Sequence, residues 1–154
     1  MDSFLFAFKG VKMFKLRSEI GFDMAHYLSG YQGKCSNIHG HRYRLVVELK
    51  SETLENEGQQ RGMVCDFTEF KKILKLVADN FDHKLIVEDN EEGKALAQRI
   101  NEGPVEFSIL FVPYRPTAEE MSRDIFNMLK NKNLPVHSVE LYETPTNSCI
   151  YTEE

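Results

Sequence analysis

The spacing of three histidines in this chain suggests a metal site. His39 and His41 are separated only by Gly40 where a strand-like stretch begins, and His26 ends an earlier stretch of similar composition. Alternate side chains of a strand share a face and lie about 6.6 Å apart, so both imidazoles can reach one ion at about 2.0–2.1 Å. A hairpin would add His26 and leave a fourth position open, as in catalytic zinc sites. The alternative is an ordinary polar strand face.

An aspartate–histidine pair and a cysteine are candidates for proton transfer. Asp82 precedes His83 directly, and a carboxylate beside an imidazole can orient it for acid–base work near neutral pH. Cys35 could act as a nucleophile or an acid–base thiol if a metal or an imidazolium stabilises its thiolate. The competing interpretations are a polar helix end for the pair and an inert buried thiol for Cys35. A joint role requires the fold to bring the three residues together.

Glu143 is a candidate for ligand binding. It lies in a predicted strand, where alternation places it on the face opposite Glu140 and Tyr142. A buried carboxylate needs a partner, and the guanidine-like edge of an amino-pyrimidinone offers two donors in a fork that matches it. The alternative is a solvated charge at the end of a strand.

Strands and capped helices are predicted to position these residues. Residues 14–25 and 41–49 are rich in aromatic and β-branched residues that roughly alternate, which predicts two antiparallel strands joined by a glycine-containing loop. Asp66 with Glu69, and Thr117 with Glu120, have the pattern of helix N-caps with reciprocal partners. Apolar residues then recur at helical spacing behind each cap: Phe67, Phe70, Leu74, Val77 and Phe81 in the first helix, and Met121, Ile125, Met128 and Leu129 in the second.

The remaining segments complete an α+β arrangement with an antiparallel sheet. Residues 105–112 and 138–143 are predicted strands, and residues 147–152 extend the latter or pair with it. The charged stretch 88–103 is predicted to be an inserted loop or a short helix. At 154 residues we expect a single domain, 1–154, with an N-terminal extension over 1–12 and an extended loop region over 88–113.

Composition excludes several classes of protein. The apolar runs are too short to cross a bilayer and the chain starts without a basic signal region, so we expect a cytoplasmic location and no membrane partner. With a net charge of −5 and scattered lysines and arginines, nucleic acid is not an expected partner. Cys35, Cys65 and Cys149 show no Cys-x-x-Cys spacing, so each is interpreted as a thiol.

Taken together, the motifs resemble the 6-pyruvoyl-tetrahydropterin synthase family over nearly the whole chain. The resemblance implies the tunnelling fold, with an antiparallel sheet and two main helices on one face, in which trimers form a β-barrel and stack as hexamers with active sites between subunits. The matching stretches follow the family's order: Phe22-Asp23-Met24-Ala25-His26, Cys35-x-x-x-His39-Gly40-His41, Val64-Cys65-Asp66-Phe67-Thr68-Glu69-Phe70-Lys71, Phe81-Asp82-His83-Lys84-Leu85, Pro116-Thr117-Ala118-Glu119, Glu143-Thr144 and Cys149-Ile150-Tyr151.

The same resemblance implies roles for individual residues. By this resemblance, zinc is held by His26, His39 and His41, protons are moved by Cys35, Asp82 and His83, and the pterin is anchored by Glu143 with help from Thr117 and Glu119. The chain departs from the family pattern at Met24, where a small residue is usual, in the longer 88–113 region and in residues 1–12.

The three residues between Cys35 and His39 resemble the bacterial 6-carboxy-tetrahydropterin synthases of queuosine biosynthesis more than the animal pyruvoyl enzymes. This implies a zinc-dependent lyase that converts 7,8-dihydroneopterin triphosphate to 6-carboxy-5,6,7,8-tetrahydropterin, acetaldehyde and triphosphate. The alternatives are a 6-pyruvoyl-tetrahydropterin synthase and a non-catalytic module that binds zinc, pterins or purines.

Overall fold

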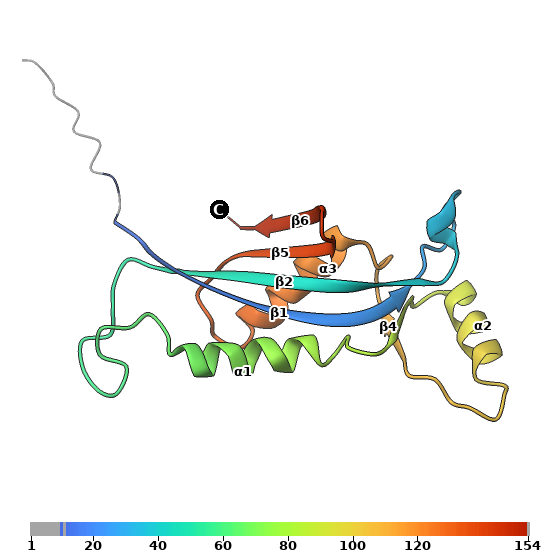
Figure 1. The fold of residues 1–154 in the computed structure, drawn as a ribbon, viewed down its shortest axis with the longest axis horizontal. Helices are drawn as coiled ribbons and strands as arrows, with labels where there is room; N and C mark the ends of the chain where they lie inside the picture. Colours follow the sequence, from blue (N-terminus) through green and yellow to red (C-terminus); the bar gives the residue numbers. More distant parts are fainter. Residues whose placement is uncertain (1–9, 11, 154) are drawn as a thin grey trace, which may run out of the picture.

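The fold is built around the long β1–β2 hairpin (Figure 1). In this computed structural model, which describes residues 10 and 12–153, β1 (Phe14–His26) and β2 (His39–Ser51) pair antiparallel along their whole length. Both strands extend slightly beyond the predicted ranges, and the added residues include His26 and His39. The predicted extension over 1–12 lies outside the described residues, apart from residues 10 and 12.

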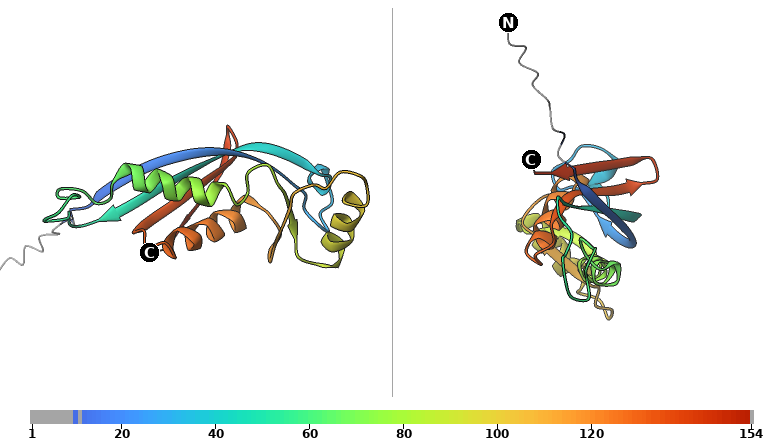
Figure 2. Two further views of the ribbon diagram at one scale, coloured as in Figure 1. Left: turned by 90° about the horizontal axis from the view of Figure 1, so that it is seen from below. Right: turned by 90° about the vertical axis from the view of Figure 1, so that its left-hand side faces the viewer.

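Six strands form one curled sheet in the order β4-β3-β1-β2-β5-β6 (Figure 2). The outer strands are β3 (Leu85–Glu88), β4 (Ile109–Val112), β5 (Val136–Thr144) and β6 (Asn147–Thr152). β5 and β6 pair antiparallel as predicted, whereas β3 pairs parallel with β1 and with β4. The prediction of a purely antiparallel sheet is therefore wrong, because the long 89–108 connection lets β4 re-enter the sheet parallel to β3.

The two predicted helices are present and cover one face of the sheet. They are α1 (Phe67–Ala78) and α3 (Ala118–Lys130). The Asp66 carboxylate accepts hydrogen bonds from the backbone of Thr68 and Glu69, at 2.6 and 3.3 Å, which confirms that cap. Thr117 Oγ1 accepts from the Glu120 backbone at 3.3 Å, while Glu120 pairs with Arg123 and not with the cap backbone.

The charged stretch contains a third helix, α2 (Glu91–Ile100), so the short-helix prediction is confirmed there. The Asn90 side chain caps α2 by accepting from the Gly93 backbone at 2.8 Å. Acidic Glu91 and Glu92 lie in its first turn, where they complement the helix dipole. The predicted strand over 105–112 is shorter than expected, because only Ile109–Val112 pair with β3.

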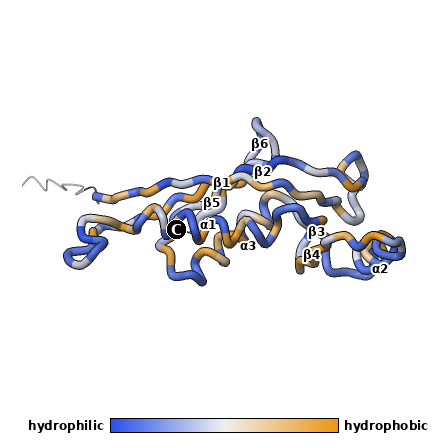
Figure 3. The backbone as a smooth tube through the Cα atoms, turned by 60° about the horizontal axis from the view of Figure 1, so that its bottom comes forward, coloured by the Kyte–Doolittle hydropathy of each residue, from blue (hydrophilic) through white to orange (hydrophobic). Residues whose placement is uncertain are grey.

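The core lies between the sheet and the helices α1 and α3. Hydrophobic and polar residues alternate along β1 and β2, and hydrophobic residues recur at intervals along the helices (Figure 3). No helix among the described residues is long and apolar enough to cross a membrane. The buried face includes β2 residues that follow the histidines in alternation, and its largest fully buried side chains are Tyr43, Phe22, Phe70, Phe81, Leu45, Leu49, Leu74, Ile86, Met121, Ile125, Leu129 and Leu141.

Candidate active site

The three histidines converge at the end of the hairpin where the loop joins β1 to β2. His26 is directly paired with His39 across the two strands, and His41 follows two residues later on the same face of β2. One ring nitrogen from each lies within 4.8 Å of the other two, as a shared metal ion requires. We call these three residues the histidine triad.

Backbone carbonyls orient two of the three rings. His26 Nδ1 lies 2.8 Å from the carbonyl oxygen of Pro116, and His39 Nδ1 lies 2.8 Å from that of Asn37. A carbonyl only accepts, so each Nδ1 must carry the proton, which leaves each Nε2 with a free lone pair. Such outer hydrogen bonds fix the tautomer and ring orientation of metal-ligating histidines.

The third ring presents an unsatisfied nitrogen. His41 Nε2 is buried and has no hydrogen-bond partner among the described residues. The nearest charged group is the Glu143 carboxylate, whose oxygen lies 3.7 Å away. Burying a polar atom without a partner is costly, so this nitrogen fits a metal ligand better than a purely structural role.

Burial keeps His26 neutral. Desolvation is the largest cause that lowers its pKa, and the neighbouring His39 and His41 lower it further. The hydrogen bond to Pro116 and the charge of Glu143 act in the opposite direction but do not cancel this effect. A neutral imidazole is the form that coordinates a metal.

Two members of the triad, His26 and His39, line a pocket of about 350 Å³, which we call the triad pocket, together with most of the other predicted site residues. Cys35 reaches it from the loop between β1 and β2, and Thr117 and Glu119 from the start of α3. Glu143 enters from β5. Its full lining is His26, Leu28, Tyr31, Cys35, His39, Thr117, Ala118, Glu119, Glu143, Asn147, Ser148 and Cys149.

Tyr43 is a site residue that sequence reasoning missed. Its hydroxyl lies 3.3 Å from Nε2 of His26 and donates to a Glu143 carboxylate oxygen at 3.4 Å. The ring is fully buried, and burial followed by the charge of Glu143 raises its pKa, so the hydroxyl stays protonated. Alternation along β2 could have revealed it, because residues 39, 41 and 43 share a face.

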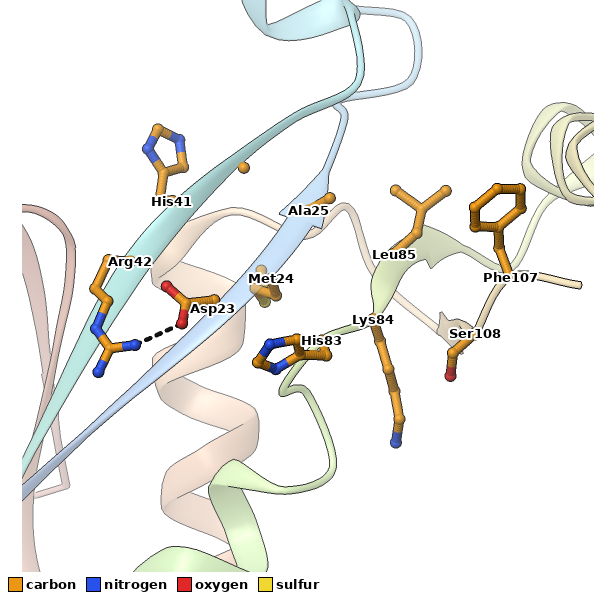
Figure 4. Close-up of a pocket in the computed structure, with 11 residues that line it drawn as sticks. Asp23, Met24, Ala25, His41, Arg42, His83, Lys84, Leu85, Phe107 and Ser108 are labelled. Carbon is orange, nitrogen blue, oxygen red and sulfur yellow. Dashed lines mark hydrogen bonds and ion pairs between the residues drawn. The ribbon is translucent and has the colours of Figure 1, made fainter. Parts of the chain in front are cut away.

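Asp82 and His83 lie elsewhere in the fold, outside the lining of the triad pocket. His83, which contacts Asp82, borders a second hollow of about 550 Å³, the outer hollow, lined by Asp23, Met24, Ala25, Gly40, His41, Arg42, His83, Lys84, Leu85, Phe107 and Ser108 (Figure 4). The His83 side chain is 80% exposed, and the ring of His41 points away from it. Cys35 does not line this hollow, so the predicted meeting of Cys35 with the pair does not occur within one chain.

The pair is nevertheless rigidly held. Asp82 accepts a hydrogen bond from the backbone of Asp23 at 2.9 Å and contacts His83 Nδ1 at 3.0 Å. The His83 backbone donates to the Asp23 carbonyl at 2.7 Å, and its φ of 57° lies in the left-handed region. The Asp23 hydrogen bond, and then His83, lower the pKa of Asp82, so this carboxylate is ionised at neutral pH.

Comparison with known proteins agrees with the geometry. A family model described as 6-pyruvoyl tetrahydropterin synthase matches residues 15–154. A curated protein of Haemophilus influenzae named 6-carboxy-5,6,7,8-tetrahydropterin synthase is 42% identical over 147 residues, covering 92% of this chain and 100% of that protein. One of the same name from Rickettsia felis is 34% identical, covering 86% of this chain and 96% of its own.

Solved structures share the fold. An uncharacterized protein of Wolinella succinogenes, WS1659, superimposes with a TM-score of 0.73 at 19% identity, covering 93% of this chain and 99% of that chain. The 6-pyruvoyl tetrahydropterin synthase of Caenorhabditis elegans gives 0.64 at 23% identity, with 94% and 98% covered. These matches confirm the predicted tunnelling fold. Because the family model spans the chain from β1 to its last residue, the chain belongs to the 6-pyruvoyl tetrahydropterin synthase family.

Proposed function

We propose that this protein is a 6-carboxy-5,6,7,8-tetrahydropterin synthase, a lyase that converts 7,8-dihydroneopterin triphosphate to 6-carboxy-5,6,7,8-tetrahydropterin, acetaldehyde and triphosphate in queuosine biosynthesis. The observation that carries the proposal is the histidine triad, two of whose members, His26 and His39, line the triad pocket beside Cys35 and Glu143. The two relatives that carry that enzyme name and cover 92% and 86% of this chain support it.

The histidine triad is the proposed zinc site. Three nitrogen ligands from two rigid strands, two of them already oriented through Nδ1, match the donor set of a catalytic zinc with one open position. When bound, zinc polarises oxygens of the substrate side chain and lowers their pKa. The unsatisfied Nε2 of His41 supports this assignment.

The other residues of the triad pocket bind the substrate and move protons. Glu143 is proposed to accept the two donors of the pterin amino-pyrimidinone edge, with Thr117 and Glu119 supporting the ring. Cys35 borders the same space as His26 and His39, so its thiol can exchange protons with a side chain held over the triad. Holding the substrate in this orientation reduces the entropic part of the barrier.

We propose that Asp82 and His83 complete the site of a neighbouring subunit in a homohexamer built from two trimers. In one chain His83 lines the outer hollow, which Cys35 does not line, and its imidazole is exposed. An ionised carboxylate beside an exposed imidazole suits a proton carrier that is presented to a partner. In a symmetric oligomer, every equivalent interface would then contain the same shared site.

Incubation of zinc-loaded protein with 7,8-dihydroneopterin triphosphate tests the activity. Acetaldehyde release and a 6-carboxy product, both lost in Cys35→Ala, are the expected result. A pyruvoyl product would replace the assignment with 6-pyruvoyl-tetrahydropterin synthase. Absence of turnover would instead favour the non-catalytic binding module. Mixing inactive Cys35→Ala and His83→Ala subunits should restore activity if sites are shared, and no restoration would contradict the shared site.

A further inference from the structure

The loop between β1 and β2 carries Cys35 and is closed by its own backbone. The Leu28 backbone donates to the Cys35 carbonyl at 2.8 Å, which ties the cysteine to the start of the loop. Ser36 and Asn37 donate to the Gly33 and Lys34 carbonyls, each at 3.1 Å, and form the short turn around it. The position of Cys35 therefore depends on whatever holds the residues beside Leu28.

Ser29, the residue after Leu28, is held by three side chains from outside the loop. It is only 7% exposed, and its hydroxyl donates to the Glu88 carboxylate at 2.6 Å while accepting from the Asn90 amide at 3.3 Å. Its carbonyl accepts from the Arg115 guanidinium at 2.6 Å. The hydroxyl and the carbonyl of Ser29 thus both bond to other elements of the fold, and such buried networks rigidify what they join.

The partners of Ser29 are themselves anchored. Glu88 ends β3, and Asn90 caps α2 with the same side chain that reaches Ser29. Arg115 immediately precedes Pro116, whose carbonyl orients His26. One face of α2 lies beside the loop at the end of the hairpin (Figure 1), around a hollow of about 400 Å³ that both elements line.

We propose that Ser29 and Arg115 are positioning residues for Cys35. The inserted segment containing α2 supports Ser29 through Glu88 and Asn90. This inference rests on the proposed function, since it assigns the support to a catalytic thiol. Ser29 donates to Glu88 and accepts from Asn90 and Arg115, and these hydrogen bonds hold the loop so that Cys35 faces the triad, while none of the three partners lines the triad pocket.

The test compares Ser29→Ala with Ser18→Ala. Ser18 is an equally buried serine of β1, 6% exposed, whose hydroxyl has no partner among the described residues, so it matches the chemical change without the network. Zinc content, kcat and KM are measured with the proposed substrate. The rate of Cys35 alkylation by iodoacetamide is measured against that of Cys65, which lies at the far end of the sheet beside α1.

In Ser29→Ala, kcat should fall by about 10- to 100-fold, because small displacements of a reacting group have effects of that size. KM and zinc content should stay at wild-type values and the Cys35 alkylation rate should change, with Ser18→Ala like the wild type. A lower melting temperature with unchanged kcat and alkylation would make Ser29 merely structural and overturn the inference. If Ser29→Ala does not fold, the exposed Arg115→Ala carries the same test with the same two outcomes.

The alkylation rate keeps this inference separate from the proposed function. If the wild type does not turn over the substrate, the proposed function fails, and the Cys35 rate in the two serine variants still decides whether Ser29 positions the thiol. Equal rates in Ser29→Ala and Ser18→Ala would overturn it.

Discussion

Gly93→Ala should detach α2 from the end of β3. A Cβ built at Gly93 would lie 2.2 Å from the Glu88 carbonyl oxygen and 2.6 Å from Val87 Cγ1. The carbonyl belongs to the backbone of β3 and cannot rotate away as a side chain can. Relief therefore requires movement of the helix start, which includes the Asn90 cap and its hydrogen bond to Ser29.

The magnitude follows from two opposing effects. Overpacking of this kind costs about 1–3 kcal/mol. Replacing glycine by alanine inside a helix returns about 0.5–1 kcal/mol. We expect a net loss of about 1–2 kcal/mol in the free energy of unfolding, equivalent to a melting temperature lower by about 2–8 °C for a domain of this size.

Calorimetry and hydrogen exchange of residues 91–100 check this prediction. Gly103→Ala is the matched control, because its added Cβ meets no atom within 4 Å and its φ does not lie in the positive region that disfavours side chains. Faster exchange across α2 and a lower melting temperature are expected only in Gly93→Ala. A Gly93→Ala protein that melts at or above the wild-type temperature, with unchanged exchange, would refute the close-packing argument.

Three further predictions concern the two halves of the site. Chelation should lower the melting temperature of zinc-loaded protein by several degrees, since ligand at about 100 times its Kd adds about 2.7 kcal/mol, and His39→Ala should abolish the shift. Asp82→Asn should lower the free energy of unfolding at pH 7, because a carboxylate whose pKa is lowered on folding stabilises the protein above its unfolded pKa of about 3.9; urea titrations should show the difference shrink as pH falls below that value and disappear as pH falls through the lower folded pKa, and a constant difference would contradict it. Tyr43→Phe should weaken pterin binding by about tenfold at unchanged fold, measured by calorimetric titration, because Glu143 loses the hydroxyl that holds it; equal affinity would assign the tyrosine to packing alone.

The triad could be predicted from sequence because it depends on local periodicity. Histidines two apart share a strand face, and a hairpin of matched length places His26 opposite His39. The caps at Asp66 and Thr117 were equally local, and both are formed. Residues within a few positions of one another determine all of these features.

The parallel part of the sheet could not be predicted in the same way. β3 and β4 are short, and their pairing depends on a connection of about twenty residues between them. The four-residue run Leu85–Glu88 has no periodicity that distinguishes a buried strand from a helix end. A stronger local signal existed for α2, since Asn90 followed by Glu91 and Glu92 is a typical helix start.

The place of Asp82 and His83 follows from the β1 strand and not from their own sequence. Both hydrogen-bond to the backbone of Asp23, on the edge of β1 that faces β3, whereas the triad partners of His26 lie across the opposite edge on β2. Asp23 and His26 are three residues apart, so their side chains lie on opposite faces of the strand. The backbone of Asp23 thus holds the aspartate–histidine pair at the β3 edge of β1, whereas the side chain of His26 is buried. Within one chain His83 and Cys35 line different hollows, and this separation is the observation behind our proposal that a second copy of the chain brings them together.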